Sequence, residues 1–260
     1  MRMINLEDVS FTWPDGGNVL KQLTFSILPG EKVVLLGANG SGKSTLLKLL
    51  NGLLFASSGR LSFEDREMTT TVFRDRAWSR SFRQRCVLLF QHPEAMLFNP
   101  TVRDEITYGP RQLGLPDAEH RLQRWSGELD LMGLLDLPPY RLSGGEKQKV
   151  ALAALLALEP DLLLLDEPMA NLDPRSSGWL IDHLLDTQAA VLVSTHNLSM
   201  AAELGRRCII LDPQGCIRYD GTVDKALNDL DLLESADLVH RHRHRHGRLT
   251  HTHRHMHDWE

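Results

Sequence analysis

One glycine-rich stretch constrains the fold of this chain more than any other. Residues 37–45 read Gly-Ala-Asn-Gly-Ser-Gly-Lys-Ser-Thr and fill the pattern G-x-x-x-x-G-K-[ST]. The apolar run Val33–Leu36 before it is typical of a buried strand, and a helix is predicted from Thr45 to about Leu50. A strand that leads through such a loop into a helix is a unit of parallel α/β sheets, so this stretch already indicates the fold class.

The loop also has the chemistry of a phosphate-binding site. Glycines let the backbone curve closely around an anion, so that successive N–H groups point at its oxygens, and the helix adds its positive dipole end. Lys43 is expected to reach the β- and γ-phosphates of a nucleotide, and the Ser44 hydroxyl is expected to ligate Mg²⁺. We predict nucleotide contacts from Asn39, Gly40, Ser41, Gly42, Lys43, Ser44 and Thr45.

Composition and charge limit the kinds of function that we expect for this chain. With 260 residues, 42% of them hydrophobic, the chain can bury a sizeable core. Its net charge of −5 offers no surface that attracts polyanions, so we expect no nucleic-acid partner. The three cysteines have no CxxC spacing, which favours reduced residues of a cytosolic protein. The charged start of the chain argues against a signal peptide, and no apolar run approaches the ~20 residues that cross a bilayer.

Strand and helix patterns alternate from Val33 onward, which predicts a right-handed, mostly parallel α/β core sheet. The runs Met3–Asp8 and Thr24–Leu28 come before it and predict an N-terminal antiparallel β subdomain. Helical stretches broken by glycine and proline over about residues 92–150 predict a smaller helical subdomain. The expected boundaries are a main domain over 1–222, a helical linker over 223–239 and a tail over 240–260.

Polar residues follow the predicted core strands at their carboxyl ends. Asp166 ends an apolar strand and is expected to hold Mg²⁺, and the adjacent Glu167 is a candidate general base for an attacking water. Gln91 follows another strand and could touch both metal and water, and His196 follows a further strand and could bind the γ-phosphate. Each has an ordinary alternative, either a helix cap or a polar surface residue. Their common position at strand ends favours one catalytic site.

A second candidate anion site lies at Ser143-Gly144-Gly145, where small residues open an apolar helix. Ser143 with Glu146 three residues later also has the spacing of a capping box. Both interpretations can hold together.

These motifs, in this order, resemble those of the ATP-binding-cassette (ABC) ATPases over about residues 3–222. The resemblance implies a P-loop NTPase fold with a helical signature subdomain, ATP and Mg²⁺ as ligands, and hydrolysis of ATP. The matching segments are Gly37–Thr45 (Walker A), Gln91 (Q-loop), Leu142–Gln148 (signature), Leu162–Glu167 (Walker B), Asn171-Leu172-Asp173 (D-loop) and His196 (switch histidine).

In that family two cassettes close head-to-tail over two ATP molecules. The resemblance implies that Ser143, Gly144 and Gly145 of one subunit, with Asp173, meet the nucleotide that Lys43 of the other subunit holds. One motif set per chain therefore implies a homodimer or a pair with a homologous subunit.

A few positions of the motifs are less typical of the family. Glu146, Met169 and Asn197 replace the commoner Gln, Thr and Asp, and none of them removes a group from the chemistry. Trp13 falls where the family places an aromatic ring that stacks on adenine. The residues alone fit an edge-strand aromatic that packs on the core equally well.

The segments Gln91–Val102 and Tyr108–Leu115 are similar to those of energy-coupling-factor ATPases, which drive vitamin and metal-ion uptake. The resemblance implies a transmembrane coupling subunit, whose helix docks in the groove beside the Q-loop, and substrate-binding membrane subunits. It also implies a place at the cytoplasmic face of the membrane. An apolar surface with Met and Phe suits helix docking, although some of these side chains must be core.

Histidine is concentrated at the end of the chain, alternating with arginine and threonine. Such a run is expected to bind a late first-row metal such as Co²⁺ or Ni²⁺; the alternative is a disordered basic tail, and disorder and metal binding are compatible. Together with the preceding segments it resembles the ATP-binding subunits of cobalt and nickel importers, the CbiO or NikO type, and we expect cobalt first. The candidate ligands are His240, His242, His244, His246, His251, His253, His255 and His257.

Other functions remain as alternatives to a cobalt importer. They are a nickel importer, an importer of another small substrate, a regulator in which the tail gates hydrolysis, and a soluble ATPase that acts on DNA or ribosomes. The distance between Gln91 and Ser143 leaves no room for the long coiled coil of chromosome-type cassettes. Translation-type cassettes usually come two to a chain, and one motif set is present here.

Overall fold

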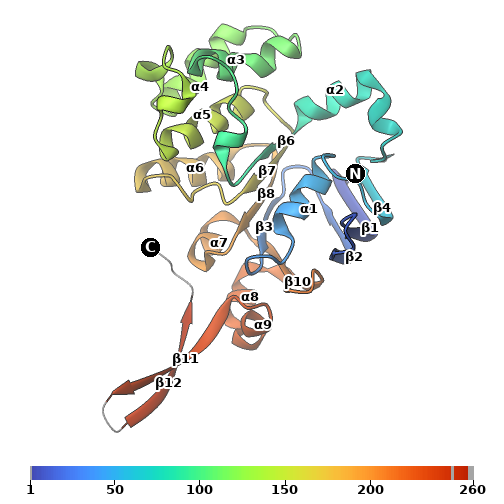
Figure 1. Cartoon of the computed structure of the whole chain (residues 1–260), viewed down its shortest axis with the longest axis vertical. Coiled ribbons are helices and arrows are strands. Elements are labelled where there is room, and N and C mark those ends of the chain that lie inside the picture. Colours follow the sequence, from blue (N-terminus) through green and yellow to red (C-terminus); the bar gives the residue numbers. More distant parts are fainter. Residues whose placement is uncertain (1, 247–248, 257–260) are drawn as a thin grey trace.

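The computed structural model describes residues 2–246 and 249–256, with side chains through Val239 except at residue 18 (Figure 1). Its centre is a six-stranded sheet in the order β10-β9-β3-β8-β7-β6, parallel apart from the β9–β10 pair. This confirms the predicted mostly parallel core sheet. Its strands are β3 (Lys32–Leu36), β6 (Cys86–Leu89), β7 (Leu162–Asp166), β8 (Ala190–Thr195), β9 (Arg207–Leu211) and β10 (Ile217–Thr222).

One face of the core sheet is covered by α1 (Lys43–Leu50) and by an antiparallel sheet in the order β2-β1-β4-β5. Alternate residues of the core strands, such as Val33 and Leu35, pack on this side, and Val34 and Leu36 pack on the other. Because both faces are buried, the central strands are continuous apolar runs. The antiparallel strands are β1 (Ile4–Thr12), β2 (Asn18–Ile27), β4 (Ser58–Phe63) and β5 (Arg66–Glu67).

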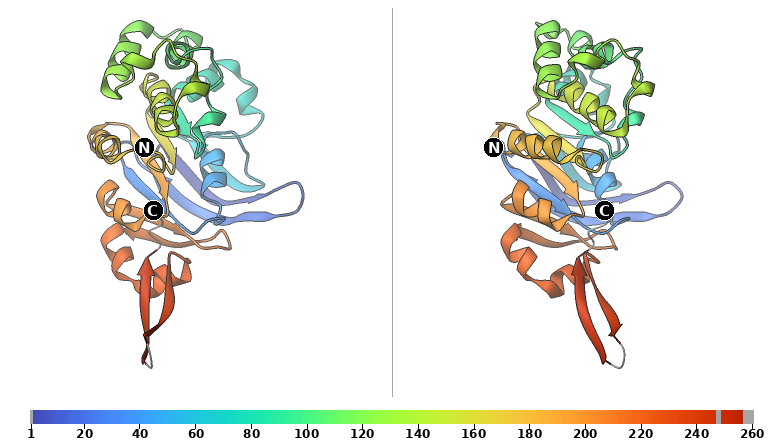
Figure 2. Two further views of the ribbon diagram at one scale, coloured as in Figure 1. Left: turned by 60° about the vertical axis from the view of Figure 1, so that its left-hand side comes forward. Right: turned by 90° about the vertical axis from the view of Figure 1, so that its left-hand side faces the viewer.

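Helices cover the other face and extend beyond the sheet at one end, where α3, α4 and α5 form the helical region (Figure 2). The ranges of these and the connecting helices are η1 (Val72–Arg74), α2 (Arg76–Arg85), η2 (Pro93–Ala95), α3 (Val102–Gln112), α4 (Ala118–Glu128), η3 (Met132–Leu134), η4 (Pro139–Arg141), α5 (Gly144–Leu156), α6 (Pro174–Asp186) and α7 (Leu198–Leu204).

The chain continues through α8 (Val223–Asn228) and α9 (Leu230–Ser235) into a hairpin of β11 (Val239–His246) and β12 (Leu249–Met256). The two strands pair antiparallel and project from the body of the molecule (Figure 1). The sequence left a disordered tail open as an interpretation of this segment, and in the structure its two halves pair as strands. A period of two, with a chemically similar residue at every second position, is the pattern of a strand.

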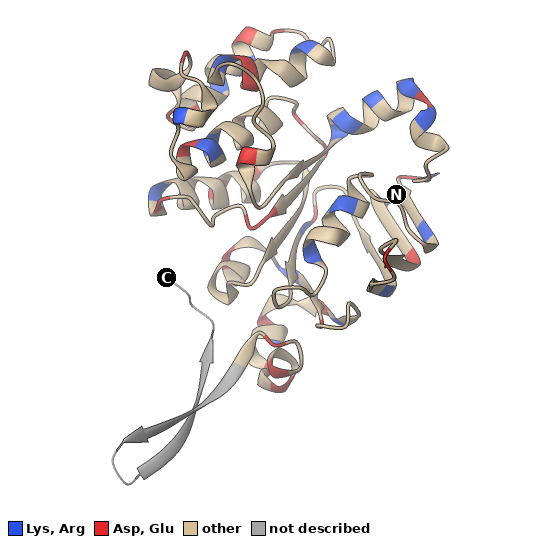
Figure 3. Ribbon diagram, in the orientation of Figure 1, with Lys and Arg blue, Asp and Glu red and all other residues tan. Residues whose placement is uncertain are grey.

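Charges of both signs are interspersed over the described part of the chain (Figure 3). Arginines are most closely spaced along α2, and the last of them, Arg85, forms ion pairs with Glu64 (2.6 Å) and Asp161 (2.5 Å). Among residues 2–246 and 249–256, no helix combines the length and the apolar character needed to cross a membrane.

Candidate functional site

The parallel strands end together at one edge of the core sheet. Leu36 of β3 pairs with Thr195 of β8, and Asp166 of β7 pairs with Ser194 of β8. Leu89 ends β6 beside Leu165 in the same way. The loops that follow these strands therefore carry their polar residues to one place, as is usual at the carboxyl edge of an α/β sheet.

A cavity of about 460 Å³ lies at this edge, between the phosphate loop, the ends of β6 and β7, and the N-terminal sheet. Its size is within the range of small-molecule and nucleotide sites, roughly 300–1,000 Å³. Val19 of β2 contributes to it and was not expected from the sequence. The sequence-predicted residues that line the cavity are Trp13, Asn39, Gly40, Gly42, Lys43, Ser44, Thr45, Gln91, Asp166 and Glu167.

Lys43 is the buried cation of this cavity, only 7% exposed. Its Nζ donates hydrogen bonds to the carbonyl oxygens of Gly37 (2.6 Å) and Ala38 (3.1 Å), which hold the ammonium group over the loop. Burial lowers the pKa of Lys43, and the nearby carboxylates of Glu167 and Asp166 act in the opposite direction. A buried ammonium group is costly unless it is paired, so this environment favours an anionic ligand.

The backbone of the loop leaves the start of α1 open. Gly42 is the N-cap residue with φ 98°, a left-handed conformation that favours glycine, and no side chain caps the first N–H groups of α1. Gly40 is left-handed as well, with φ 83°. Ser41 does not line the cavity; it is buried, and a β-carbon at Gly37 would lie 2.6 Å from its Oγ.

Asp166 is held in place by a serine that the sequence reasoning missed. It is the last residue of β7, buried, and its Oδ1 accepts a hydrogen bond from the hydroxyl of Ser194 on β8. The backbone N–H of Glu167 donates to the carbonyl oxygen of Ser194 at 3.1 Å. The only signal in the sequence was a serine near the end of an otherwise apolar strand, two residues before His196.

Glu167 and His196 form a direct pair. His196 Nδ1 lies 2.7 Å from Glu167 Oε1, and with Glu167 ionised this nitrogen is the donor. Glu167 has φ 46°, a conformation that side-chain-bearing residues adopt at a cost, and its hydrogen bonds to Ser194 hold it. The glutamate is only 9% exposed, while the His196 side chain is 41% exposed. A buried carboxylate at a cavity wall, oriented by an imidazole, has the arrangement of a general base with its positioning partner.

The donor set of the cavity fits both predicted ligands. The hydroxyl of Ser44, the amide oxygen of Gln91 and the carboxylate of Asp166 line the same cavity, and such oxygen groups are what Mg²⁺ prefers. Lys43 and the open N–H groups of α1 fit the phosphates of a nucleotide.

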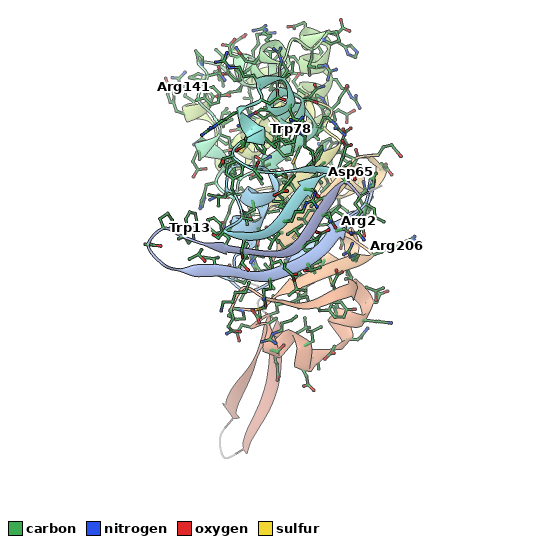
Figure 4. The ribbon with its side chains drawn as sticks, turned by 90° about the vertical axis from the view of Figure 1, so that its right-hand side faces the viewer. Arg2, Trp13, Asp65, Trp78, Arg141 and Arg206 are labelled. Carbon is green, nitrogen blue, oxygen red and sulfur yellow. The ribbon has the colours of Figure 1, made fainter. Side chains whose placement is uncertain are left out.

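Trp13 packs against Phe11 and also lines the cavity. Its ring packs edge-on against Phe11, with centroids 4.9 Å apart and an interplanar angle of 85°. It also lines the cavity and is 37% exposed, beside the turn that joins β1 and β2 (Figure 4). The indole therefore packs on its own strand with one edge and remains available for stacking.

The start of α5 lies outside this cavity. The Ser143 hydroxyl accepts a hydrogen bond from the N–H of Glu146 (3.3 Å), and Glu146 accepts one from the N–H of Ser143 (2.7 Å), so the predicted capping box is formed. Gly145 approaches the loop before α6 closely: a β-carbon there would lie 2.8 Å from the carbonyl oxygen of Asn171. Gly144 faces the Asn171 side chain. Within one chain, Gly144 and Gly145 thus lie beside Asn171, and residues 143–145 do not line the cavity.

Asp173 also has a structural role in its own chain. As the N-cap residue of α6, it accepts hydrogen bonds from the hydroxyl (2.6 Å) and the N–H (3.0 Å) of Ser176. Lys149 of α5 lies 3.6 Å from its carboxylate. The bonds from Ser176 lower the pKa of Asp173 to about 2. The predicted metal ligands of the tail lie outside the residues whose side chains are described.

Comparison with known proteins agrees with this geometry. A family model described as ABC transporter matches residues 20–170. A protein of Methanosarcina acetivorans is 40% identical over 92% of this chain and 89% of its own length. The energy-coupling factor transporter ATP-binding protein EcfA of Methanothermobacter thermautotrophicus is 34% identical over 91% of this chain and 76% of its own.

Solved structures are similar over most of the chain as well. The chain cbiO1 from Clostridium perfringens, described as part of the ABC transporter complex cbiONQ, has a TM-score of 0.74 and 27% identity, covering 91% of this chain and 95% of that one. A dimeric ATP-binding cassette bound to ADP and phosphate has a TM-score of 0.77 and 24% identity, covering 85% of this chain and 99% of that one. This last likeness concerns the fold alone.

Proposed function

This chain belongs to the ABC transporter family, and we propose that it is the ATP-hydrolysing motor of an energy-coupling-factor importer for a transition-metal ion, with cobalt as the first candidate. It is an ABC ATPase whose hydrolysis of ATP is coupled to transport. The observation that carries the motor role is the single cavity in which Lys43, Gln91, Asp166 and Glu167 meet. The likeness to EcfA and to a subunit of a cbiONQ complex supports the subfamily.

The residues of the cavity divide the work of hydrolysis. Lys43 and the N–H groups at the start of α1 bind the β- and γ-phosphates, and Trp13 stacks on the adenine. Ser44, Asp166 and Gln91 would hold Mg²⁺, which would supply positive charge beside the phosphates. Glu167 takes the proton of the attacking water, and its bond to His196 fixes the carboxylate in the orientation for this step.

The active assembly is a dimer with two-fold symmetry. The family resemblance implies that Ser143 and Gly145 act on the nucleotide of a partner subunit, and their place outside the phosphate cavity of their own chain supports this. Asp173 lies near them, through its ion pair with Lys149 of α5. ATP binding closes the two subunits and hydrolysis releases them.

The membrane subunits receive this motion beside Gln91. In the segment after β6, Phe98 is 67% exposed and Tyr108 is 42% exposed, and their rings meet edge-on at 5.0 Å. An exposed aromatic pair suits the docking of an amphipathic helix. The chain thus works at the cytoplasmic face of the membrane as a peripheral subunit.

Uptake of labelled metal tests this proposal. Cells that make this protein with the membrane proteins encoded beside it are supplied with labelled Co²⁺ or Ni²⁺, and the Glu167→Gln variant serves as the inactive control. Uptake of Co²⁺ that disappears in the control is the expected result, and uptake of Ni²⁺ alone would make nickel the substrate. Active hydrolysis without uptake of either ion would contradict the metal assignment.

A further inference from the structure

The C-terminal hairpin sets histidines directly opposite one another. β11 and β12 pair without a register shift, from Val239 opposite Met256 to His246 opposite Leu249. Within this span the two histidine runs match. The histidine–histidine pairs are His240 with His255, His242 with His253, and His244 with His251.

These six positions share one face of the ribbon. Successive residues of a strand alternate between its faces, and residues directly opposite in a pair share a face. The positions between the histidines fall on the other face, where Arg241 lies opposite Arg254 and Arg243 lies opposite Thr252. The register therefore places the histidine positions on one face of the hairpin and most of the arginine and threonine positions on the other.

The spacing of such a ladder suits metal ions. Opposite residues of an antiparallel pair have Cα atoms about 4.5–5.5 Å apart, and every second residue along a strand is about 6.8 Å from the last. Two adjacent pairs place four histidines at neighbouring register positions of one face, four ligands complete a tetrahedral or square-planar site, and imidazole suits zinc, copper, iron and nickel.

The ribbon also needs a source of stability. A two-stranded hairpin without further packing is marginally stable in water, and arginines directly opposite each other repel. Its start is fixed, because Leu238 and Val239 are buried in the core beside Leu233 of α9. Beyond that point β11 and β12 leave the body of the molecule (Figure 2). An ion that bridges both strands would supply the missing cross-strand link, so that binding and folding are coupled.

We propose that this hairpin is a binding site for late first-row divalent cations, built from cross-strand histidine pairs whose register, and not their number alone, sets the affinity. Two adjacent pairs form one site, and metal binding keeps the strands paired. The proposed function determines only which metal the hairpin meets in the cell; the binding site itself does not depend on it.

Two variants with the same number of histidines test the role of register. His240→Ala with His255→Ala removes one complete pair and leaves two adjacent pairs. His240→Ala with His253→Ala leaves a single pair and two unpaired histidines. Ni²⁺ is titrated into the purified full-length chain by calorimetry, and a variant with all six histidines replaced by alanine gives the background. We expect the second variant to bind at least about tenfold more weakly than the first, because a ligand already held nearby binds with a high effective concentration.

Hydrogen exchange of the β11 amides gives a second measurement. Ni²⁺ should slow exchange in the wild-type chain and in the first variant more than in the second. Equal affinities in the two variants, or no Ni²⁺ binding above background, would overturn the inference, and equal affinities would indicate chelation by an unpaired tail. The titration needs no membrane subunit. Absent uptake with register-dependent binding would contradict the proposed substrate and leave this site standing.

Discussion

Two helix N-termini of this molecule have the sequence of anion sites, and the structure finishes them differently. At α1 the N-cap residue is Gly42, no side chain caps the helix, and Lys43 lies buried beside the open N–H groups. At α5 the N-cap Ser143 and Glu146 satisfy each other in a complete capping box. The first terminus leaves its donors for a ligand, and the second satisfies two of its donors, the N–H groups of Ser143 and Glu146, within the chain.

The difference matches two separate roles, which are nucleotide binding within one chain at α1 and contact with a partner subunit at α5. The α1 terminus sits in a cavity with the metal and base candidates, so one chain can bind a nucleotide. The α5 terminus is exposed, and a phosphate reaching Ser143 would compete with Glu146, which lies 2.8 Å from the serine hydroxyl. Because of this cap, the N-terminus of α5 stays folded when no phosphate is bound. Such a terminus suits a surface that binds its ligand only when two subunits close.

The largest expected effect comes from Glu167→Gln, which removes the base and keeps the shape. Turnover should fall by about 10²- to 10⁴-fold, because the amide cannot accept the proton of the attacking water. ATP binding should persist, and the variant should accumulate as an ATP-bound dimer. Steady-state phosphate release and size-exclusion chromatography with ATP measure the two quantities. Normal turnover in this variant would exclude Glu167 as the base.

The strand-end residues of the site could be predicted because each of them follows an apolar run with a visible end, whereas Val19 of β2 could not. Asp166, Gln91 and His196 could be placed at one sheet edge without knowing which strands are neighbours. The bond from Ser194 to Asp166 could not be foreseen, because it depends on the register between β7 and β8. The hairpin shows the same limit: period two indicated an extended chain, while the partner of each histidine is a matter of register.

The next largest effect is a change in ATP affinity, which compares the N-termini of α1 and α5 directly. Lys43→Ala should weaken ATP binding by the isolated chain about 10- to 100-fold, since a hydrogen bond from a charged group is worth about 1.5–3 kcal/mol. Ser143→Ala should leave this affinity within about twofold, because distant sites behave independently. In the Glu167→Gln background, Ser143→Ala should reduce the ATP-dependent dimer.

Loss of a helix cap alone has to be separated from loss of a dimer contact. Thr101→Ala is the matched control, because the Thr101 hydroxyl caps α3 by accepting from the N–H of Asp104 (3.1 Å), far from the signature segment in the sequence. Both alanine variants should lose similar stability, and only Ser143→Ala should lose the dimer. If calorimetry found weaker ATP binding for Ser143→Ala in the isolated chain, the two termini would not be independent.

The smallest expected effect concerns Asp173, which caps α6 and forms an ion pair with Lys149 of α5. The folded chain lowers the pKa of Asp173 to about 2, first through the hydroxyl of Ser176 and then through its N–H. A carboxyl with a depressed folded pKa stabilises the fold above its unfolded pKa of about 3.9, and this contribution is lost as the pH falls toward 2. Asp173→Ala should lower the melting temperature by about 2–4 °C at pH 7, as expected for a lost cap in a chain of this size.

Asp173→Asn separates the cap from the charge. Asparagine is as good an N-cap residue as aspartate, so this variant should lose less than the alanine variant at pH 7. Its deficit relative to wild type should shrink between about pH 4 and pH 2, because protonation of the unfolded wild-type carboxyl removes the advantage of the ionised Asp173 there, while asparagine has no carboxyl group to titrate. Scanning calorimetry across this range measures the difference. A deficit that stayed constant with pH would mean that the charge of Asp173 does not contribute, and that the start of α6 depends on the geometry of its cap alone.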